Sequence, residues 1–144
     1  MINNGVINQL KRNTVALVSI IIAISSLSYN TWRNEKTEEN RNQRLASFEV
    51  LLKLNELQQV IFHSHYDKDS SDKGNPRTGW THVLTVRDLS RILQPPLPAA
   101  ADELLRVWGE NWEGLDEKKM NVDLIMAEID NVRSKTLLLL DSLE

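Results

Sequence analysis

Residues 122–143, VDLIMAEIDNVRSKTLLLLDSL, decide the fold. Within this stretch, side chains that can enter a core recur at alternating intervals of three and four residues: Val122, Ile125, Ile129, Val132, Thr136, Leu139 and Leu143. This heptad spacing places all seven on one face of an α-helix. We therefore predict a helix that packs along its whole length against other helices of the same chain, with an intermolecular coiled coil as the alternative.

The same stretch carries leucines outside the heptad face, among them Leu124, Leu137 and Leu138. A self-contained bundle normally places polar residues at such outer positions. Left bare, these leucines would promote aggregation, so another surface should cover them. We predict that they contact a protein partner, although the first helix of the chain, the bilayer or a second copy could also cover them.

Two shorter helices are predicted before this one. The first covers residues 80–93 and is stopped by Pro95 and Pro96, while the second opens at residues 97–98 and closes at Gly114. The last helix is then expected to begin near Asp116. Trp108 and Trp112 lie one turn apart on the second of these helices, either as core or rim aromatics or as an aromatic anchor for a partner.

The helix predicted before these is apolar on two sides. One stripe contains Leu45, Phe48, Leu51 and Leu52, and the other contains Val50, Leu54, Leu57 and Ile61. At 100° per residue the two stripes lie on different faces, so both should have apolar neighbours. We expect this helix to be the central element of the bundle. Residues 33–46 are mostly polar, lack Gly and Pro, and should lead into it as a helical stalk.

Residues 13–32 form an uncharged run of 20 residues between Arg12 and Arg33. As a helix this run would rise about 30 Å, which matches the hydrocarbon core of a bilayer. Its centre contains Ile20, Ile21 and Ile22, and it ends with aromatic rings that favour the headgroup level, those of Tyr29 and Trp32. We predict a single transmembrane helix that contacts the lipid bilayer through these five residues.

Two alternatives to an uncleaved anchor stay open, because the second half of the run is rich in serine. Residues 1–28 could be a cleaved signal peptide, and the run could be a buried core helix. The preferred division is a tail at 1–12, the membrane helix at 13–32, the stalk at 33–46 and a soluble helical bundle at 47–144. Basic residues flank both ends of the run, so orientation is nearly balanced. A periplasmic domain on a cell inner membrane is favoured over a cytoplasmic one.

Composition narrows the possible functions of the 144 residues. Residues 1–97 carry 12 Lys and Arg against 9 Asp and Glu, whereas residues 98–144 carry 5 against 11. A chain without a basic face is poorly suited to nucleic acid. The absence of cysteine excludes disulfides and thiolate chemistry. Only five glycines and four prolines argue against an all-β fold, so the expected class is all-α.

One cluster could carry chemistry, His63, His65 and Asp67, which contains residue types that bind transition metals. On a helix the two histidines would lie 200° apart, so we interpret the cluster as a polar loop with helix-end histidines. The sequence contains none of the phosphate-binding, nucleophile or zinc motifs of known enzymes, and we predict no cofactor.

The leading hypothesis is therefore a membrane-tethered helical module that binds another protein or a second copy, as an accessory or scaffold subunit of a membrane complex. Two alternatives are a bundle that senses a small ligand and a metal-dependent enzyme using His63, His65 and Asp67. An enclosed pocket would favour the ligand sensor, and convergent polar groups would favour the enzyme.

Overall fold

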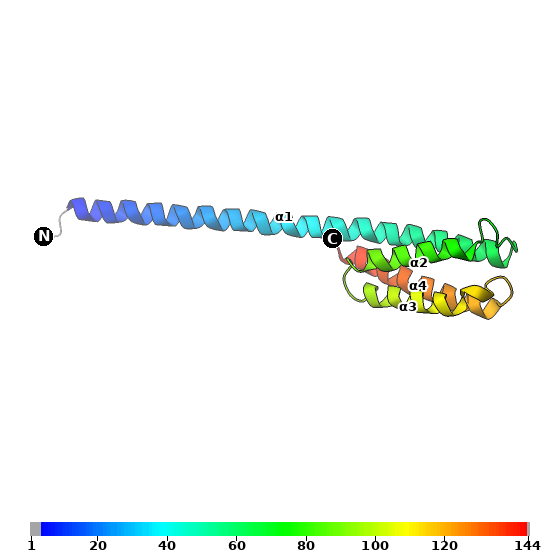
Figure 1. The fold of residues 1–144 in the computed structure, drawn as a ribbon. Helices are drawn as coiled ribbons and strands as arrows, with labels where there is room; N and C mark the ends of the chain where they lie inside the picture. Colours follow the sequence, from blue (N-terminus) through cyan, green and yellow to red (C-terminus); the bar gives the residue numbers. More distant parts are fainter. Residues whose placement is uncertain (1–3, 144) are drawn as a thin grey trace. The chain divides into compact units, whose positions relative to one another are not determined.

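The fold is all-α, in a computed structural model that describes residues 4–143. In these residues it contains four α-helices and one 3₁₀ helix: α1 (Asn4–His65), α2 (Pro76–Ser90), α3 (Leu97–Asn111), η1 (Trp112–Gly114) and α4 (Lys119–Ser142) (Figure 1). The chain divides into two compact units, Met1–Glu39 and Asn40–Glu144. The bundle unit therefore begins seven residues before the predicted boundary at 47.

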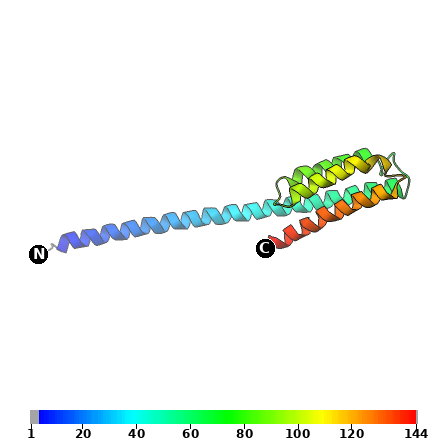
Figure 2. The ribbon, with the colours of Figure 1, turned by 90° about the horizontal axis from the view of Figure 1, so that it is seen from below.

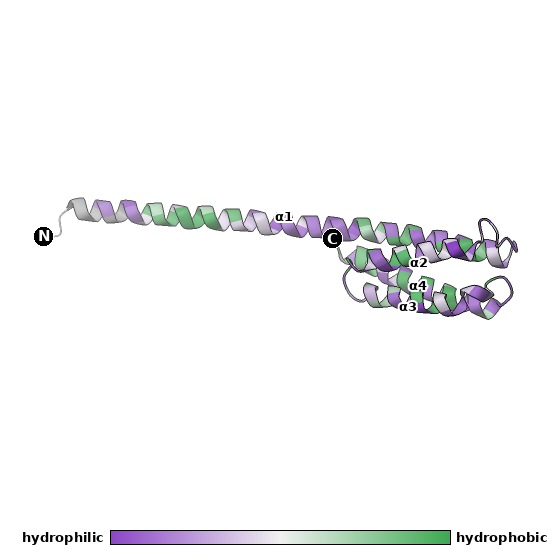
Figure 3. Cartoon of the chain, in the orientation of Figure 1, coloured by the Kyte–Doolittle hydropathy of each residue, from purple (hydrophilic) through white to green (hydrophobic). Residues whose placement is uncertain are grey.

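Residues 4–39 of the first unit belong to α1 and carry the apolar run, which Figure 3 shows as the most hydrophobic stretch of this part of the helix. By length and composition this helix could cross a membrane, and a signal sequence would satisfy the same criteria. The five predicted lipid contacts, Ile20, Ile21, Ile22, Tyr29 and Trp32, are all exposed. The Ser19 hydroxyl donates to the Val15 carbonyl oxygen at 2.8 Å, so this polar group is satisfied within the helix.

The second unit is an up-down-up-down bundle built by residues 40–65 of α1 with α2, α3 and α4 (Figures 1 and 2). At one end, the Gln43 side chain lies against the α2–α3 loop and Arg44 donates to the Leu143 carbonyl oxygen. At the other end, His65 Nδ1 lies 2.8 Å from the Leu115 carbonyl oxygen. These long-range bonds set α1 antiparallel to α4.

The predicted heptad face of α4 is confirmed as the centre of the core. All seven of its positions are buried, including Ile129 and Val132 at full burial. They meet the inner stripe of α1, which contains Val50, Leu54, Leu57 and Ile61, and apolar residues of α2 and α3. The intramolecular bundle, rather than an intermolecular coiled coil, therefore accounts for this heptad pattern.

Two predicted helix starts were wrong. Helix α2 begins at Pro76 instead of Trp80, because the Asn75 side chain caps it by accepting from the Arg77 amide and proline at N1 is pre-shaped for a first turn. Helix α4 begins at Lys119 instead of Asp116, because η1 and a following turn occupy the residues between. Helix α2 ends at Ser90, three residues before the predicted end, and α3 ends at Asn111, with the separate helix η1 reaching the predicted Gly114.

A buried amide joins α1 to the α2–α3 loop. Gln43 Nε2 donates to the Ile92 carbonyl oxygen at 2.7 Å, and Gln43 Oε1 accepts from the Gln94 amide at 3.2 Å. One side chain thus satisfies both a donor and an acceptor of the loop backbone. Because Gln43 itself is buried, the bundle includes residues that the sequence assigned to the polar stalk.

Candidate interaction surface

The leucines of α4 outside the heptad face are exposed, as their positions indicated. Leu124 is 44% exposed, Leu137 is 48% exposed and Leu138 is 68% exposed. Within the chain these three side chains stay uncovered, so the first helix, α1, is excluded as the surface that covers them. Large apolar side chains left in solvent mark a surface that another molecule can bury.

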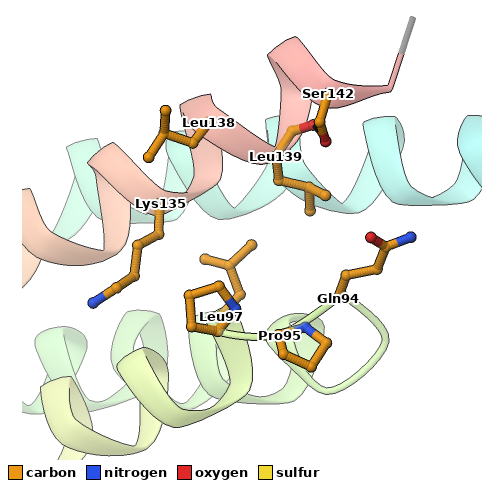
Figure 4. A pocket seen from close by; sticks show the side chains of 8 residues that line it. Gln94, Pro95, Leu97, Lys135, Leu138, Leu139 and Ser142 are labelled. Carbon is orange, nitrogen blue, oxygen red and sulfur yellow. Dashed lines mark hydrogen bonds between the residues drawn. The ribbon is translucent and has the colours of Figure 1, made fainter.

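Leu138 lies at a shallow groove between the end of α4 and the start of α3 (Figure 4). The groove has a volume of about 220 Å³ and is bordered by Pro95, Leu97, Lys135 and Leu139. The Lys135 ammonium donates to the Asn131 side-chain oxygen, which fixes the cation beside an apolar depression. The depression is smaller than the usual pockets for drug-sized ligands, and its size suits one apolar side chain of a partner.

The two tryptophans separate into different roles. Trp108 is fully buried and its ring lies against Gly79, so the alternative that made it an anchor for a partner is wrong and the core interpretation holds. It also meets Trp80 edge-on, with ring centroids 6.4 Å apart. Trp112 is half-buried and contacts Trp80 with centroids 6.3 Å apart, which places it at the rim of the core.

The outer stripe of α1 is the main departure from the expected bundle. Leu45, Phe48 and Leu52 are each more than half exposed, and Leu51 is half-buried. Only the inner stripe is packed, because three neighbouring helices are too few to surround α1. The prediction of a helix covered on two sides was therefore wrong for the single chain, and α1 keeps an apolar outer face.

The histidine cluster does not converge. His63 Nδ1 lies 2.6 Å from Asp67 Oδ2, whereas His65 Nδ1 is directed to the Leu115 carbonyl oxygen. Among the residues that the structure describes, no three His, Cys, Asp or Glu side chains are grouped to hold a metal ion. The Asp69 carboxylate accepts from the backbone of Ser71 and Asp72 and from the Ser71 hydroxyl, which holds the turn in the α1–α2 loop and lowers the pKa of Asp69.

A second groove, of about 350 Å³, runs between α1 and α2 and is polar. His82 Nδ1 lies 3.1 Å from Glu56 Oε2 inside it, and Glu56 also accepts from Lys53 at 2.8 Å. Burial lowers the pKa of His82, against the opposite effect of the Glu56 carboxylate. The lowered pKa favours the neutral imidazole, which lies within hydrogen-bonding distance of Glu56 and so links the two helices.

Comparison of this chain with known proteins finds no match. The chain matches no protein-family model, no curated protein and no solved structure. Its class is that of an all-α bundle with one N-terminal apolar helix, and any function has to be argued from its own surfaces.

Proposed function

We propose that this chain is a membrane-tethered helical interaction module, an accessory or scaffold subunit of a membrane complex. The observation that carries the proposal is the exposure of large apolar side chains on two faces of a well-packed bundle, on α4 and on the outer face of α1. A packed core shows that these residues are surplus to folding. Their exposure is explained if a partner buries them.

The setting we propose is the cell inner membrane, with residues 13–32 as a single span and the bundle in the periplasm. Support comes from the apolar run in α1. The most hydropathic stretch of this run is not buried anywhere within the chain. Tyr29 and Trp32 lie with ring centroids 6.2 Å apart at the end of this run, as expected for an interfacial aromatic belt.

Membrane insertion and orientation can be measured together. Because the chain has no cysteine, Ser70→Cys in the exposed α1–α2 loop gives a single thiol. We expect the full-length chain to stay in membranes after carbonate extraction, and the thiol to react with an impermeant maleimide in intact spheroplasts. Release by carbonate would contradict the span. Shortening by about 3 kDa, the mass of residues 1–28, would indicate a cleaved signal. Labelling only after lysis would place the bundle in the cytoplasm.

The partner surface can be tested by photo-crosslinking in native membranes from residue 138. We expect specific adducts from this position and none from Thr81, an exposed residue on α2 that serves as the control. Leu138→Lys should abolish the complex between this chain and the crosslinked partner. It should leave the melting temperature of the bundle unchanged, since Leu138 contributes little to the core. Crosslinks confined to one chain, together with an unchanged complex size for Leu138→Lys, would contradict the proposal and favour the small-ligand sensor.

A further inference from the structure

The outer face of α1 carries a second heptad pattern. Seven positions at intervals of three and four residues run along it, and all seven are exposed: Leu45, Phe48, Leu52, Asn55, Gln59, Phe62 and Tyr66. The first six lie in α1 and Tyr66 directly follows its last residue. Five of the seven are apolar or aromatic. We call this set the outer seam.

The outer seam has the geometry that another α-helix would match. Side chains at alternating three- and four-residue intervals form the knobs that enter the holes of a facing helix in a coiled coil. The opposite side of α1 already holds the bundle core, with Val50, Leu54 and Leu57 fully buried. A helix docked on the outer seam would therefore add to the bundle without disturbing it.

Two amides in the middle of the outer seam indicate which helix would dock there. Asn55 Oδ1 accepts from Arg133 at 2.7 Å, which fixes the orientation of its amide, and an amide has capacity for further bonds through its nitrogen and second lone pair. An unrelated apolar helix would bury the Asn55 amide nitrogen and the Gln59 amide without partners from the docked helix. A second copy in parallel and in register would face each amide with its own counterpart, the arrangement by which a polar seam position sets register.

Charges beside the outer seam favour the same arrangement. In a parallel coiled coil, the residue just before the first seam position of a heptad faces the residue five positions later on the partner helix. This rule pairs Arg44 of one copy with Glu49 of the other, which is an attractive pair. In an antiparallel arrangement that overlaps the whole seam, Glu49 would face His63 and the two Glu56 side chains would face each other, each beside Lys53 of its own chain. The parallel arrangement thus joins opposite charges, and the antiparallel one brings carboxylates together.

The proposed membrane tether also favours parallel copies. The twelve residues 33–44 between the span and the outer seam reach at most about 40 Å when fully extended. Both copies would then hold the Leu45 end of the seam near the same membrane. Confinement at one surface raises the effective concentration of each copy for the other, which matters for a seam of only three heptads with two amides at its centre.

We propose that two copies of this chain associate in the membrane through their outer seams, as a parallel, in-register helix pair. The inference rests on the proposed function, because it names the partner at one of the two exposed faces and uses the membrane tether. The leucines of α4 stay free for a different contact.

Cysteine scanning of the full chain in native membranes tests this pairing. We expect copper phenanthroline to convert the single-cysteine variants Phe48→Cys, Leu52→Cys and Phe62→Cys to disulfide dimers, while Thr81→Cys on α2 stays monomeric. Orientation is tested by producing two variants in the same cells, Leu45→Cys and Tyr66→Cys, each with a different affinity tag. Each variant should form disulfide dimers with copies of the same variant and none with the other variant. Mixed dimers would overturn the parallel arrangement, and equal dimer formation at Thr81 would overturn the seam.

A charge in the seam provides a second measurement. Leu52→Lys should reduce disulfide formation at Phe62→Cys at least tenfold and leave the melting temperature of the bundle unchanged. The control is Ile92→Lys, at a similarly exposed residue of the α2–α3 loop, which should change neither the crosslinking nor the melting temperature. Unaltered crosslinking in Leu52→Lys would overturn the inference. Adducts from residue 138 without any seam dimer would overturn the inference and leave the proposed function standing, whereas no product from either position would overturn both.

Discussion

Replacing Ile129 by aspartate should unfold the helical bundle, because Ile129 is fully buried at the centre of the α4 heptad face. The change removes a core side chain and places a carboxylate among apolar neighbours without a partner. We expect a loss of more than about 4 kcal/mol in the free energy of unfolding, a large part of the stability of a domain of this size. Urea denaturation followed by circular dichroism would measure it.

Ala127→Asp is the matched control for that variant, since it adds the same charge to the exposed side of the same helix. Its expected loss is below about 1 kcal/mol, the difference in helix propensity. If Ile129→Asp melts like the control, the heptad face of α4 is not the core of the folded chain.

Gly79→Ala should destabilise the protein, although alanine is the better helix former. A Cβ at position 79 would lie 2.3 Å from both Cη2 and Cζ2 of Trp108. The Trp108 ring is fully buried and packed edge-on against Trp80, so it has no space into which to move. We expect a net loss of about 1–3 kcal/mol from overpacking, measured by thermal and urea denaturation.

Gly109→Ala is the control and should change stability in the opposite direction. Gly109 also lies inside a helix and beside a tryptophan, but its Cβ would be 3.5 Å from Trp80 Cη2, an ordinary contact. Here the propensity difference alone should act, with a gain of about 0.5–1 kcal/mol. Stabilisation by both substitutions would mean that Trp108 does not pack on Gly79.

The regular parts of the fold could be predicted because they depend on periodicity. The α4 heptad face and the outer leucines such as Leu138 follow from spacing alone. The start of α2 also had a local signal, an asparagine cap followed by proline, although the predicted start lay four residues later, at residue 80.

The parts that sequence could not predict depend on how many helices are available and how they meet. Two apolar stripes on α1 indicate two covered faces, yet a bundle of four helices buries only one of them. Gln43 resembles the other polar residues of the stalk, and its role arises from a loop about fifty positions away. Trp108 was assigned both to the core and to the surface, and only its contact with Gly79 decides between them.

Arg44 and the Leu143 carbonyl oxygen, which a hydrogen bond joins in the fold, are 99 positions apart in the chain, so they leave the ribosome at different times. Helix α1 emerges from the ribosome first, but the helix that buries much of its inner stripe emerges last. During the interval α1 is exposed on both apolar stripes, and segments in this state are prone to aggregate or to bind chaperones. A nascent chain held close to a membrane, or beside a second nascent copy, would have its outer stripe protected before its core has closed.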